Sequence, residues 1–276
     1  MKQRKLGPDG PFVGAIGIGG MPMSTRENRP EKADSARVLL HAFERGVTLW
    51  DTADSYSLGD HERGHNEEIF AHAYAQLSQK ERETVTIATK GGWKRPDGNW
   101  VLDGRPDALR EAIEGSLRRL QTDCISLYQF HWPDPQTPFS DSVEAIANAQ
   151  KAGKIRFVGL SNVSTEQIEI ARQIVPIQSV QNRYSWTHRA PEEDGVLALC
   201  NELGIAFLPW SPLGGIGAAK DAGEDGELSK LAQEWGVSPQ RAALAWLLEK
   251  GERVIPIPGA TRLESVEDNV LAAELV

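Results

Sequence analysis

The sequence predicts an α/β fold, a single-domain (β/α)8 barrel of the TIM-barrel type, on three observations. The chain has 276 residues, close to the roughly 250 that such a barrel needs. Short apolar segments alternate with longer amphipathic segments, and this alternation predicts parallel strands joined by right-handed helical crossovers. Eight such units occur without a long linker or low-complexity tract, so we expect one domain over residues 1–276.

The first segments predict a hairpin ahead of the barrel. Residues 2–6 and 11–13 flank Gly7-Pro8-Asp9-Gly10, whose composition is typical of a tight turn. We expect this β-hairpin to close the bottom of the barrel. The glycine-rich segment that follows resembles a dinucleotide-binding fingerprint, but the third glycine is missing because Pro22 stands at its position. A Rossmann half is therefore not expected here.

The remaining elements follow from apolar periodicity and from helix stop signals such as Gly46, Gly153 and Gly204. Asn66 is expected to cap the second helix. The predicted strands are Ala15–Gly19, Val47–Asp51, Val85–Lys90, Ile125–His131, Ile155–Ser161, Ser179–Asn182, Ile205–Trp210 and Arg253–Ile257. The predicted helices are Asp34–Arg45, Asn66–Leu77, Pro106–Leu120, Ser140–Ala152, Thr165–Ile174, Pro191–Leu203, Leu228–Trp235, Pro239–Lys250 and Leu263–Ala273.

Composition excludes several classes of protein. A net charge of −9 argues against a general binder of nucleic-acid backbones. Cys124 and Cys200 lie far apart without metal-type spacing, which predicts reduced thiols and no metal site. The basic start is followed by a turn instead of an apolar signal-peptide core, and no apolar run is long enough to span a membrane. We therefore expect a soluble, cytoplasmic protein.

Polar residues gather where the predicted strands end. Asp51, Lys90 and His131 end the second, third and fourth strands, and further polar residues end the later ones. The carboxyl ends of the strands form the functional face of this type of barrel, so these side chains are expected to meet. The later strand ends are Ser161-Asn162, Gln181-Asn182, Trp210-Ser211 and the segment 258–262.

The chemistry of this group favours proton transfer to a carbonyl oxygen. Taken alone, the stretch 49–56 favours a structural role, with Asp51 capping a turn and Tyr56 half-buried. Tyrosine is a poor acid at neutral pH, but a neighbouring ammonium such as Lys90 lowers its pKa by stabilising the phenolate. Asp51 can keep Lys90 charged, and a neutral His131 can orient a carbonyl oxygen. Such a site needs a nicotinamide cofactor to supply hydride.

Two other patterns are weighed and set aside. Residues 61–65 read His-Glu-Arg-Gly-His, the letters of a zinc-peptidase motif, but Gly64 lies inside the motif and no third ligand is evident. A short-chain dehydrogenase would need a Tyr-x-x-x-Lys pair, and none of the four tyrosines has one. A flexible polar loop at the rim of the site is the better interpretation of residues 61–65.

The chain resembles the aldo-keto reductases. The matching segments, in chain order, are residues 51–56 (DTADSY), 88–91 (ATKG), 129–134 (QFHWPD), 159–162 (GLSN), 180–185 (VQNRYS), 209–214 (PWSPLG) and 257–260 (IPGA). The resemblance implies a barrel that binds NADP(H) without a Rossmann domain and reduces aldehydes and some ketones. It makes Tyr56 the proton donor, Asp51 and Lys90 the pair that tunes it, and His131 the carbonyl orienter.

The same resemblance implies the cofactor site. Ser161, Asn162 and Gln181 would hold the nicotinamide carboxamide, and Trp210 would stack on its ring. The loop 211–214 would cover the pyrophosphate, and residues after the eighth strand would hold the adenosine phosphate. The full set implied is Gly20, Met21, Ser161, Asn162, Gln181, Trp210, Ser211, Pro212, Leu213, Gly214, Gly259, Ala260, Thr261, Arg262, Asp268 and Asn269.

The chain departs from the family pattern near the expected phosphate site. Gly259 and Ser265 stand where many members carry lysine and arginine, which leaves Arg262 to favour NADPH over NADH. The chain ends at the last helix, so we expect no C-terminal tail over the substrate pocket, whose walls would be Trp93 and Trp132. For Trp93 the alternative stays open that residues 94–99 carry its loop outward and the ring only anchors the loop at the rim. The alternative to an enzyme is a regulatory module of the same fold that binds NADP(H) without turnover.

Overall fold

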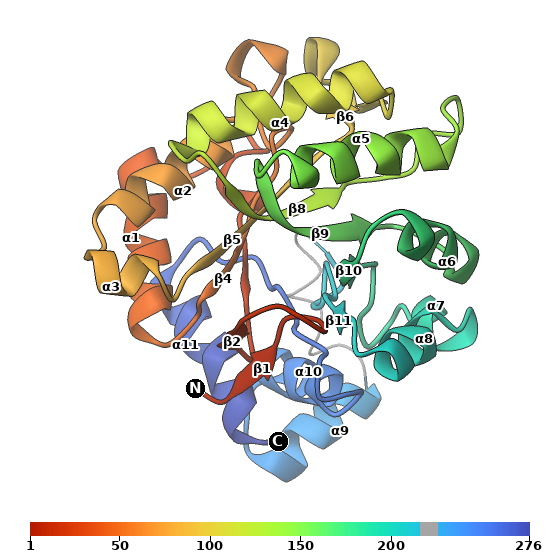
Figure 1. Ribbon diagram of the computed structural model, residues 1–276. Coiled ribbons are helices and arrows are strands. Elements are labelled where there is room, and N and C mark those ends of the chain that lie inside the picture. Colours follow the sequence, from red (N-terminus) through yellow and green to blue (C-terminus); the bar gives the residue numbers. More distant parts are fainter. Residues whose placement is uncertain (216–225) are drawn as a thin grey trace.

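The computed structural model describes residues 1–215 and 226–276 and shows a closed α/β barrel. Its seven-stranded parallel sheet has the order β11-β10-β9-β8-β5-β4-β3, and helices pack around the outside of it (Figure 1). The sheet strands are β3 (Ile18–Gly19), β4 (Leu49–Asp51), β5 (Thr86–Gly91), β8 (Ile125–Phe130), β9 (Ile155–Ser161), β10 (Ile177–Gln181) and β11 (Ala206–Phe207). The predicted fold class is confirmed.

The helices follow the strands in the predicted alternation. The described α-helices are α1 (Lys32–Glu44), α2 (His65–Ala75), α3 (Gln79–Arg82), α4 (Pro106–Leu120), α5 (Phe139–Lys151), α6 (Thr165–Ile174), α7 (Ala190–Glu193), α8 (Val196–Leu203), α9 (Gly226–Trp235), α10 (Pro239–Leu248) and α11 (Leu263–Leu271). Short 3-10 turns are η1 (Met21–Met23), η2 (Asp60–Glu62), η3 (Pro96–Gly98) and η5 (Ala272–Glu274).

The eighth predicted strand closes the barrel without forming a regular ladder. Its backbone bridges β11 through Phe207 and Val254, and it bridges β3 through Gly19 and Gly259. Pro256 and Pro258 accept hydrogen bonds from Gly17 and Gly19 but have no N–H to donate. The contact with β3 is therefore held by a single bridge and by two accepting carbonyls, whereas on the β11 side Ile255 and Ile257 donate to the carbonyls of Phe207 and Pro209.

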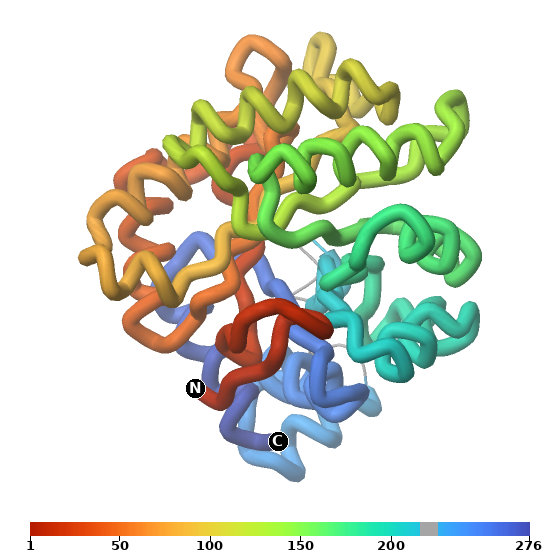
Figure 2. Tube along the Cα trace, viewed as in Figure 1, coloured from red at the N-terminus to blue at the C-terminus, as the bar shows by residue number. Residues whose placement is uncertain are grey.

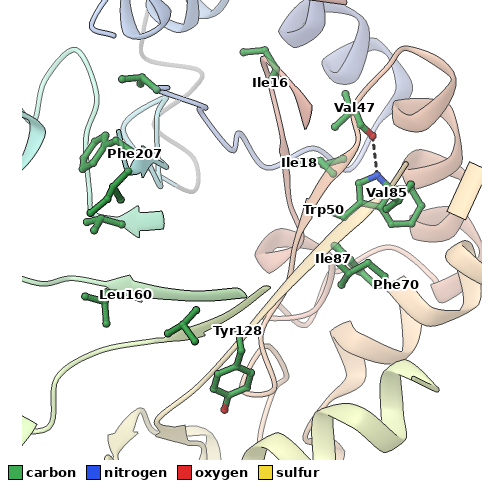
Figure 3. Close-up of a cluster of buried hydrophobic side chains, with 14 of the residues drawn as sticks. Ile16, Ile18, Val47, Trp50, Phe70, Val85, Ile87, Tyr128, Leu160 and Phe207 are labelled. Carbon is green, nitrogen blue, oxygen red and sulfur yellow. Dashed lines mark hydrogen bonds between the residues drawn. The ribbon is translucent and has the colours of Figure 1, made fainter. Parts of the chain in front are cut away.

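Side chains alternate between the inside and the outside of the barrel, as the strand period requires. Leu49 and Leu127 belong to an inner apolar layer, whereas Trp50 and Tyr128 belong to the larger core under the helices. Figure 3 shows this outer core around Trp50, whose indole N–H donates to the Val47 carbonyl at 3.0 Å. Above the inner layer the lumen becomes polar toward the carboxyl ends of the strands.

The N-terminal hairpin closes the opposite end of the barrel. β1 (Gln3–Lys5) and β2 (Phe12–Gly14) pair antiparallel across the predicted turn. Leu6 and Val13 are fully buried and pack with the inner apolar layer, so the hairpin seals the bottom as expected. Lys2 donates to the carbonyl of Val276, and the two chain ends lie near each other (Figures 1 and 2).

Three local expectations are corrected. The second helix begins after Gly64, which adopts φ +87°, and Asn66 is no cap because its amide bonds Gly20 and Thr52 instead. The predicted helix 191–203 is broken into α7 and α8 at Gly195, where φ is +81°. An unpredicted hairpin of β6 (Trp93–Lys94) and β7 (Val101–Leu102) follows β5.

Candidate active site

The centre of the site is an ion pair at the polar end of the lumen. Asp51 ends β4 and Lys90 lies near the end of β5, and the parallel register of these neighbouring strands turns both side chains inward. The Lys90 ammonium donates to Asp51 Oδ2 at 2.7 Å, to the Thr52 carbonyl at 2.9 Å and to Tyr56 Oη at 3.2 Å. Lys90 is fully buried, and its three protons thus have three partners.

The loop after β4 brings Tyr56 back over this pair. Thr52 and Asp54 continue the pairing with β5 by donating to the carbonyls of Ala88 and Lys90 at 2.8 and 3.2 Å. The chain then turns, and the Tyr56 amide donates to the Ala53 carbonyl at 3.3 Å. The strand end therefore sets the position of the phenol, as the predicted motif implied.

The electrostatics of the trio keep a proton on the phenol and a charge on the ammonium. Burial raises the pKa of Tyr56 and outweighs Lys90, whose charge lowers it. Burial alone would lower the pKa of Lys90, but the Asp51 carboxylate and Tyr56 reverse this, so its pKa is raised. We expected Lys90 to lower the pKa of Tyr56 below its ordinary value; Lys90 acts in that direction, but desolvation is the larger effect.

His131 lies beside the phenol, just after β8. Its ring is 5.7 Å from the Tyr56 ring, centroid to centroid, and nearly perpendicular to it. Burial and the positive charge of Lys90 hold the pKa of His131 well below its ordinary value, so the imidazole is neutral at neutral pH. Its buried Nδ1 has no hydrogen-bond partner in the described part of the chain.

Two glutamines, one on β8 and one on β10, complete the polar layer. Gln181 donates to Asp51 Oδ1 at 2.8 Å, and Gln129 donates to the same oxygen at 3.2 Å. Both carboxylate oxygens of Asp51 are therefore bonded, one to Lys90 and the other to the amides. Sequence reasoning missed Gln129, although it points to the same side of β8 as the lumen residue Leu127 and could have been found from the alternation.

A cavity of about 390 Å³ opens above this layer. It runs from Tyr56 and His131 past the ends of the later strands to the segment after the eighth one. The predicted site residues that line it are Asp51, Tyr56, His131, Met21, Ser161, Asn162, Gln181, Trp210, Ser211, Pro212, Leu213, Gly259, Trp93 and Trp132. Residues that line it without having been predicted include Pro22, Arg26, Trp100, Ile257 and Pro258.

Hydrogen bonds lock the middle of the cavity wall. Asn162, at φ +59°, donates to the His131 carbonyl at 3.1 Å and accepts from the Trp210 indole at 2.9 Å. Ser161 donates to the Gln181 carbonyl at 2.8 Å. This network joins the ends of four strands, β8, β9, β10 and β11, and fixes the indole that forms part of the cavity wall.

The other predicted site residues lie outside the cavity wall. Lys90 lies beneath it, and Gly20 faces Asn66 and Phe70 instead of the cavity. Arg262 is exposed at the N-cap of α11, and Asp268, on the same helix, pairs with Arg241 at 2.7 Å. The remaining members of this set are Gly214, Ala260, Thr261 and the buried Asn269.

The β6–β7 hairpin holds the aromatic part of the mouth. Trp93 forms edge-to-face contacts with Trp100, His131 and Trp132, with ring centroids 5.7, 6.4 and 6.0 Å apart. The hairpin therefore turns Trp93 toward the site instead of carrying it outward. Trp132 is 39% exposed, which places it at the open rim.

The His-Glu-x-x-His letters do not form a metal site. His61 and Glu62 lie in η2, whereas His65 begins α2, and Gly64 between them breaks any shared helix face. Glu62 pairs with Arg29 at 2.6 Å, and His65 bonds the Ser24 hydroxyl at 2.9 Å. Across residues 1–215 and 226–276, no cluster of three potential metal-binding side chains occurs, and no helix is long and apolar enough to cross a membrane.

Fold and site together define a barrel with a buried Lys–Asp pair under a phenol and a neutral imidazole. The pattern described as "Aldo/keto reductase family" matches residues 15–276. The probable aldo-keto reductase 1 of Glycine max is 33% identical over 295 residues, covering 96% of this chain and 82% of the relative. The aldo-keto reductase yakc of Schizosaccharomyces pombe, named with NADP(+), is 32% identical over 297 residues, covering 96% and 85%.

A solved structure is similar in fold to this chain as well. The aldo/keto reductase of Klebsiella pneumoniae, in complex with NADP and acetate, superposes with a TM-score of 0.82 at 26% identity, over 100% of this chain and 91% of that one. The chain therefore belongs to the aldo/keto reductase family and is an oxidoreductase.

Proposed function

We propose that this protein reduces aldehydes and some ketones to alcohols, with NADPH as the hydride donor and Tyr56 as the proton donor. The observation that carries the proposal is the hydrogen bond from the buried, charged Lys90 to the Tyr56 hydroxyl at the floor of the cavity. A phenol held this way can release a proton to an alkoxide as it forms, because the ammonium stabilises the resulting phenolate.

The residues present fit a nicotinamide cofactor. The indole of Trp210 lines the cavity beside Asn162 and Ser161, which offers an aromatic face next to amide and hydroxyl groups. The names of the yakc relative and the Klebsiella structure support NADP(H) as the cofactor. Trp210, Ser161, Asn162 and Gln181 would hold the nicotinamide, which supplies hydride to the carbonyl carbon when bound.

Each catalytic side chain then has a separate task. Tyr56 holds its proton until the carbonyl oxygen gains negative charge, and Lys90 favours the transfer. Asp51 keeps Lys90 charged, since a buried ammonium without a partner would lose its proton. The neutral His131 can donate one hydrogen bond to the carbonyl oxygen and orient it without competing with Tyr56 as an acid.

The test removes only the phenolic oxygen. We expect Tyr56→Phe to fold and to bind NADPH, measured by quenching of tryptophan fluorescence, but to lose roughly 10²–10⁴-fold in kcat for unactivated aldehydes. Near-normal turnover by this variant would contradict the role of Tyr56. Binding of NADPH by the wild type without oxidation by any aldehyde would favour the alternative, a regulatory module that binds the cofactor.

Preference for NADPH is proposed to depend on Arg262. Its exposed guanidinium stands at the start of α11, where the helix N-terminus also favours an anion. We expect Arg262→Ala to weaken NADPH about tenfold while NADH binding stays within about twofold, since a charge-assisted hydrogen bond contributes roughly 1.5–3 kcal/mol. Equal dissociation-constant ratios for the two cofactors in wild type and variant would exclude Arg262 as the phosphate ligand.

The aromatic mouth supports a broad range of apolar substrates. Trp93 and Trp132 bind apolar bodies through contact area, and hydrophobic pockets discriminate by only about 1–3 kcal/mol per methylene. We expect aromatic and medium aliphatic aldehydes to be reduced well and free sugars poorly. Values of kcat/KM over benzaldehydes, alkanals, dicarbonyls and sugars would check this, and one compound preferred by several orders of magnitude would contradict it.

A further inference from the structure

One cation lines the cavity and has no role so far. Arg26 is an exposed residue between η1 and α1, and it lines the same cavity as Tyr56, His131 and Trp100. In the described part of the chain it has no ion pair and no side-chain hydrogen bond. An arginine placed on a cavity wall without a protein partner is available to a ligand.

Three other cations, on the segment before α1 and on the β6–β7 hairpin, are already engaged. Arg29 pairs with Glu62 through two bonds of 2.6 and 2.7 Å, and Lys94 pairs with Asp103 at 2.5 Å. Arg95 donates to the Ser57 carbonyl at 2.9 Å and its guanidinium lies 3.9 Å from the centroid of a tryptophan ring. None of these three cations is therefore free to take the place of Arg26.

The backbone that carries Arg26 is held on both sides. Thr25 donates to the Met21 carbonyl through its amide at 3.2 Å and its hydroxyl at 3.0 Å. The Arg29 amide donates to the Arg26 carbonyl at 3.1 Å, and the Arg29 side chain bonds the Ser24 carbonyl at 3.0 Å. The backbone position of Arg26 is thus fixed by hydrogen bonds on both sides.

We propose that Arg26 selects carbonyl substrates that carry a carboxylate at the end remote from the reacting carbonyl. The tryptophan rings would contact the body of such a molecule, Tyr56 and His131 its carbonyl, and Arg26 its acid group. A guanidinium binds a carboxylate through two parallel hydrogen bonds. The net charge of −9 makes this local cation important, because the protein as a whole repels anions.

This inference rests on the proposed function, and its test separates the two. Wild type and Arg26→Gln are compared, with NADPH, on para-formylbenzoate and on its uncharged methyl ester, which presents the same aldehyde. We expect the variant to lose about tenfold in kcat/KM for the acid, mainly through KM, and less than twofold for the ester. Arg26→Lys should recover part of the loss.

Arg118→Gln is the matched control, since it removes one exposed charge from α4, away from the cavity. It should leave the acid-to-ester ratio unchanged. An unchanged ratio in Arg26→Gln would overturn the inference. Equal losses for both substrates, with weaker NADPH binding, would overturn it too, because they would assign Arg26 to the cofactor phosphates.

A binding measurement keeps the inference testable without turnover. Quenching of the mouth tryptophans by para-methylbenzoate, with NADP⁺ present, should be about tenfold weaker in Arg26→Gln, and its methyl ester should not be affected. Equal affinities in the two proteins would overturn the role of Arg26. Absence of NADPH oxidation with every aldehyde would contradict the proposed function, whatever the binding measurement shows.

Discussion

Two buried ionic clusters lie on opposite faces of the same strands. The inner cluster is the Asp51–Lys90 pair in the lumen under Tyr56. The outer cluster lies behind β5, where Thr89 donates to Glu67 of α2 at 2.6 Å and Glu67 accepts from Arg119 of α4 at 2.6 Å. Because side chains alternate along a strand, Lys90 and Thr89 are consecutive residues that serve different clusters.

The two clusters differ in how completely their polar atoms are satisfied. In the inner cluster, the ammonium and both carboxylate oxygens have partners. The outer cluster also includes Asp54, Arg63 and Tyr128. Asp54 pairs with Arg63. Three buried atoms of this cluster have no partner in the described part of the chain: Asp54 Oδ1, Arg119 Nη2 and Tyr128 Oη. Complete satisfaction is thus found in the ion pair beneath the proposed proton donor.

The outer cluster instead fixes the loop that carries Tyr56. The Asp54 carbonyl accepts from the Gly64 amide at 2.8 Å, immediately before α2. Gly64 has φ +87°, and a Cβ there would lie 2.0 Å from Arg119 Cδ. Both the backbone conformation and the lack of space therefore oppose a side chain at this position. We propose that the inner cluster serves the reaction and the outer cluster holds the loop, and three predictions test this division.

The largest effect is expected from Lys90→Met. It should lower kcat by roughly 10²–10⁴-fold, because Tyr56 would lose the charge that favours release of its proton. It should also lower the free energy of unfolding by roughly 3–5 kcal/mol, since Asp51 would stay buried without its cation. Kinetics and denaturant unfolding measure the two effects, with the exposed Lys80→Met as control; near-normal turnover would contradict the assignment.

Arg119→Met should separate stability from chemistry. It leaves the fully buried Glu67 with Thr89 as its remaining side-chain partner, so we expect a loss of about 3 kcal/mol in the free energy of unfolding. At a temperature where the variant is folded, kcat should stay within about threefold of wild type. A hundredfold fall in kcat without a change in stability would show that the outer cluster takes part in the reaction.

The smallest effect is a pH dependence of stability from Asp54. Burial, opposed by Arg63, raises the pKa of Asp54 from 3.8 to about 6, and its unpartnered Oδ1 can accept the proton. The folded state then binds this proton more tightly than the unfolded state, so the free energy of unfolding rises as pH falls from about 6 to about 4. One pKa unit is worth about 1.4 kcal/mol, which limits the gain to about 3 kcal/mol.

Unfolding by urea between pH 4 and 7 measures the pH dependence in wild type and in Asp54→Asn. The asparagine cannot titrate, so the stability difference between the two proteins should change with pH across this range. Parallel curves would show that Asp54 has the same pKa folded and unfolded. Activity at pH 7 should be less affected by this change than by Lys90→Met.

The sequence predicted the parts of the molecule that local patterns determine. Asp51, Lys90 and His131 were found because each directly ends an apolar strand. The outer cluster was not predicted, because Glu67, Arg119 and Thr89 meet only after two helices pack on β5. The cap at Asn66 was wrong for a similar reason, since tertiary partners took its amide.

Most of the site residues that the sequence did not predict lie in loops. Arg26 and Trp100 lie in irregular segments, where neither periodicity nor spacing predicts which residues face the cavity. The return of Trp93 to the site depends on the β6–β7 hairpin, whose strands are two residues each. The broken eighth strand was predicted at the right place, but Pro256 within it and Pro258 directly after it cannot donate to a regular ladder.

The hairpin at the bottom of the barrel restricts how molecules enter and leave the cavity. Leu6 and Val13 are fully buried against the apolar layer of the lumen, so the barrel is closed at this end. Molecules that reach Tyr56 must therefore arrive and depart through the same mouth, on the side of the strand carboxyl ends. A product still resting there blocks the next arrival, and the rate of departure can then limit turnover however fast the proton moves.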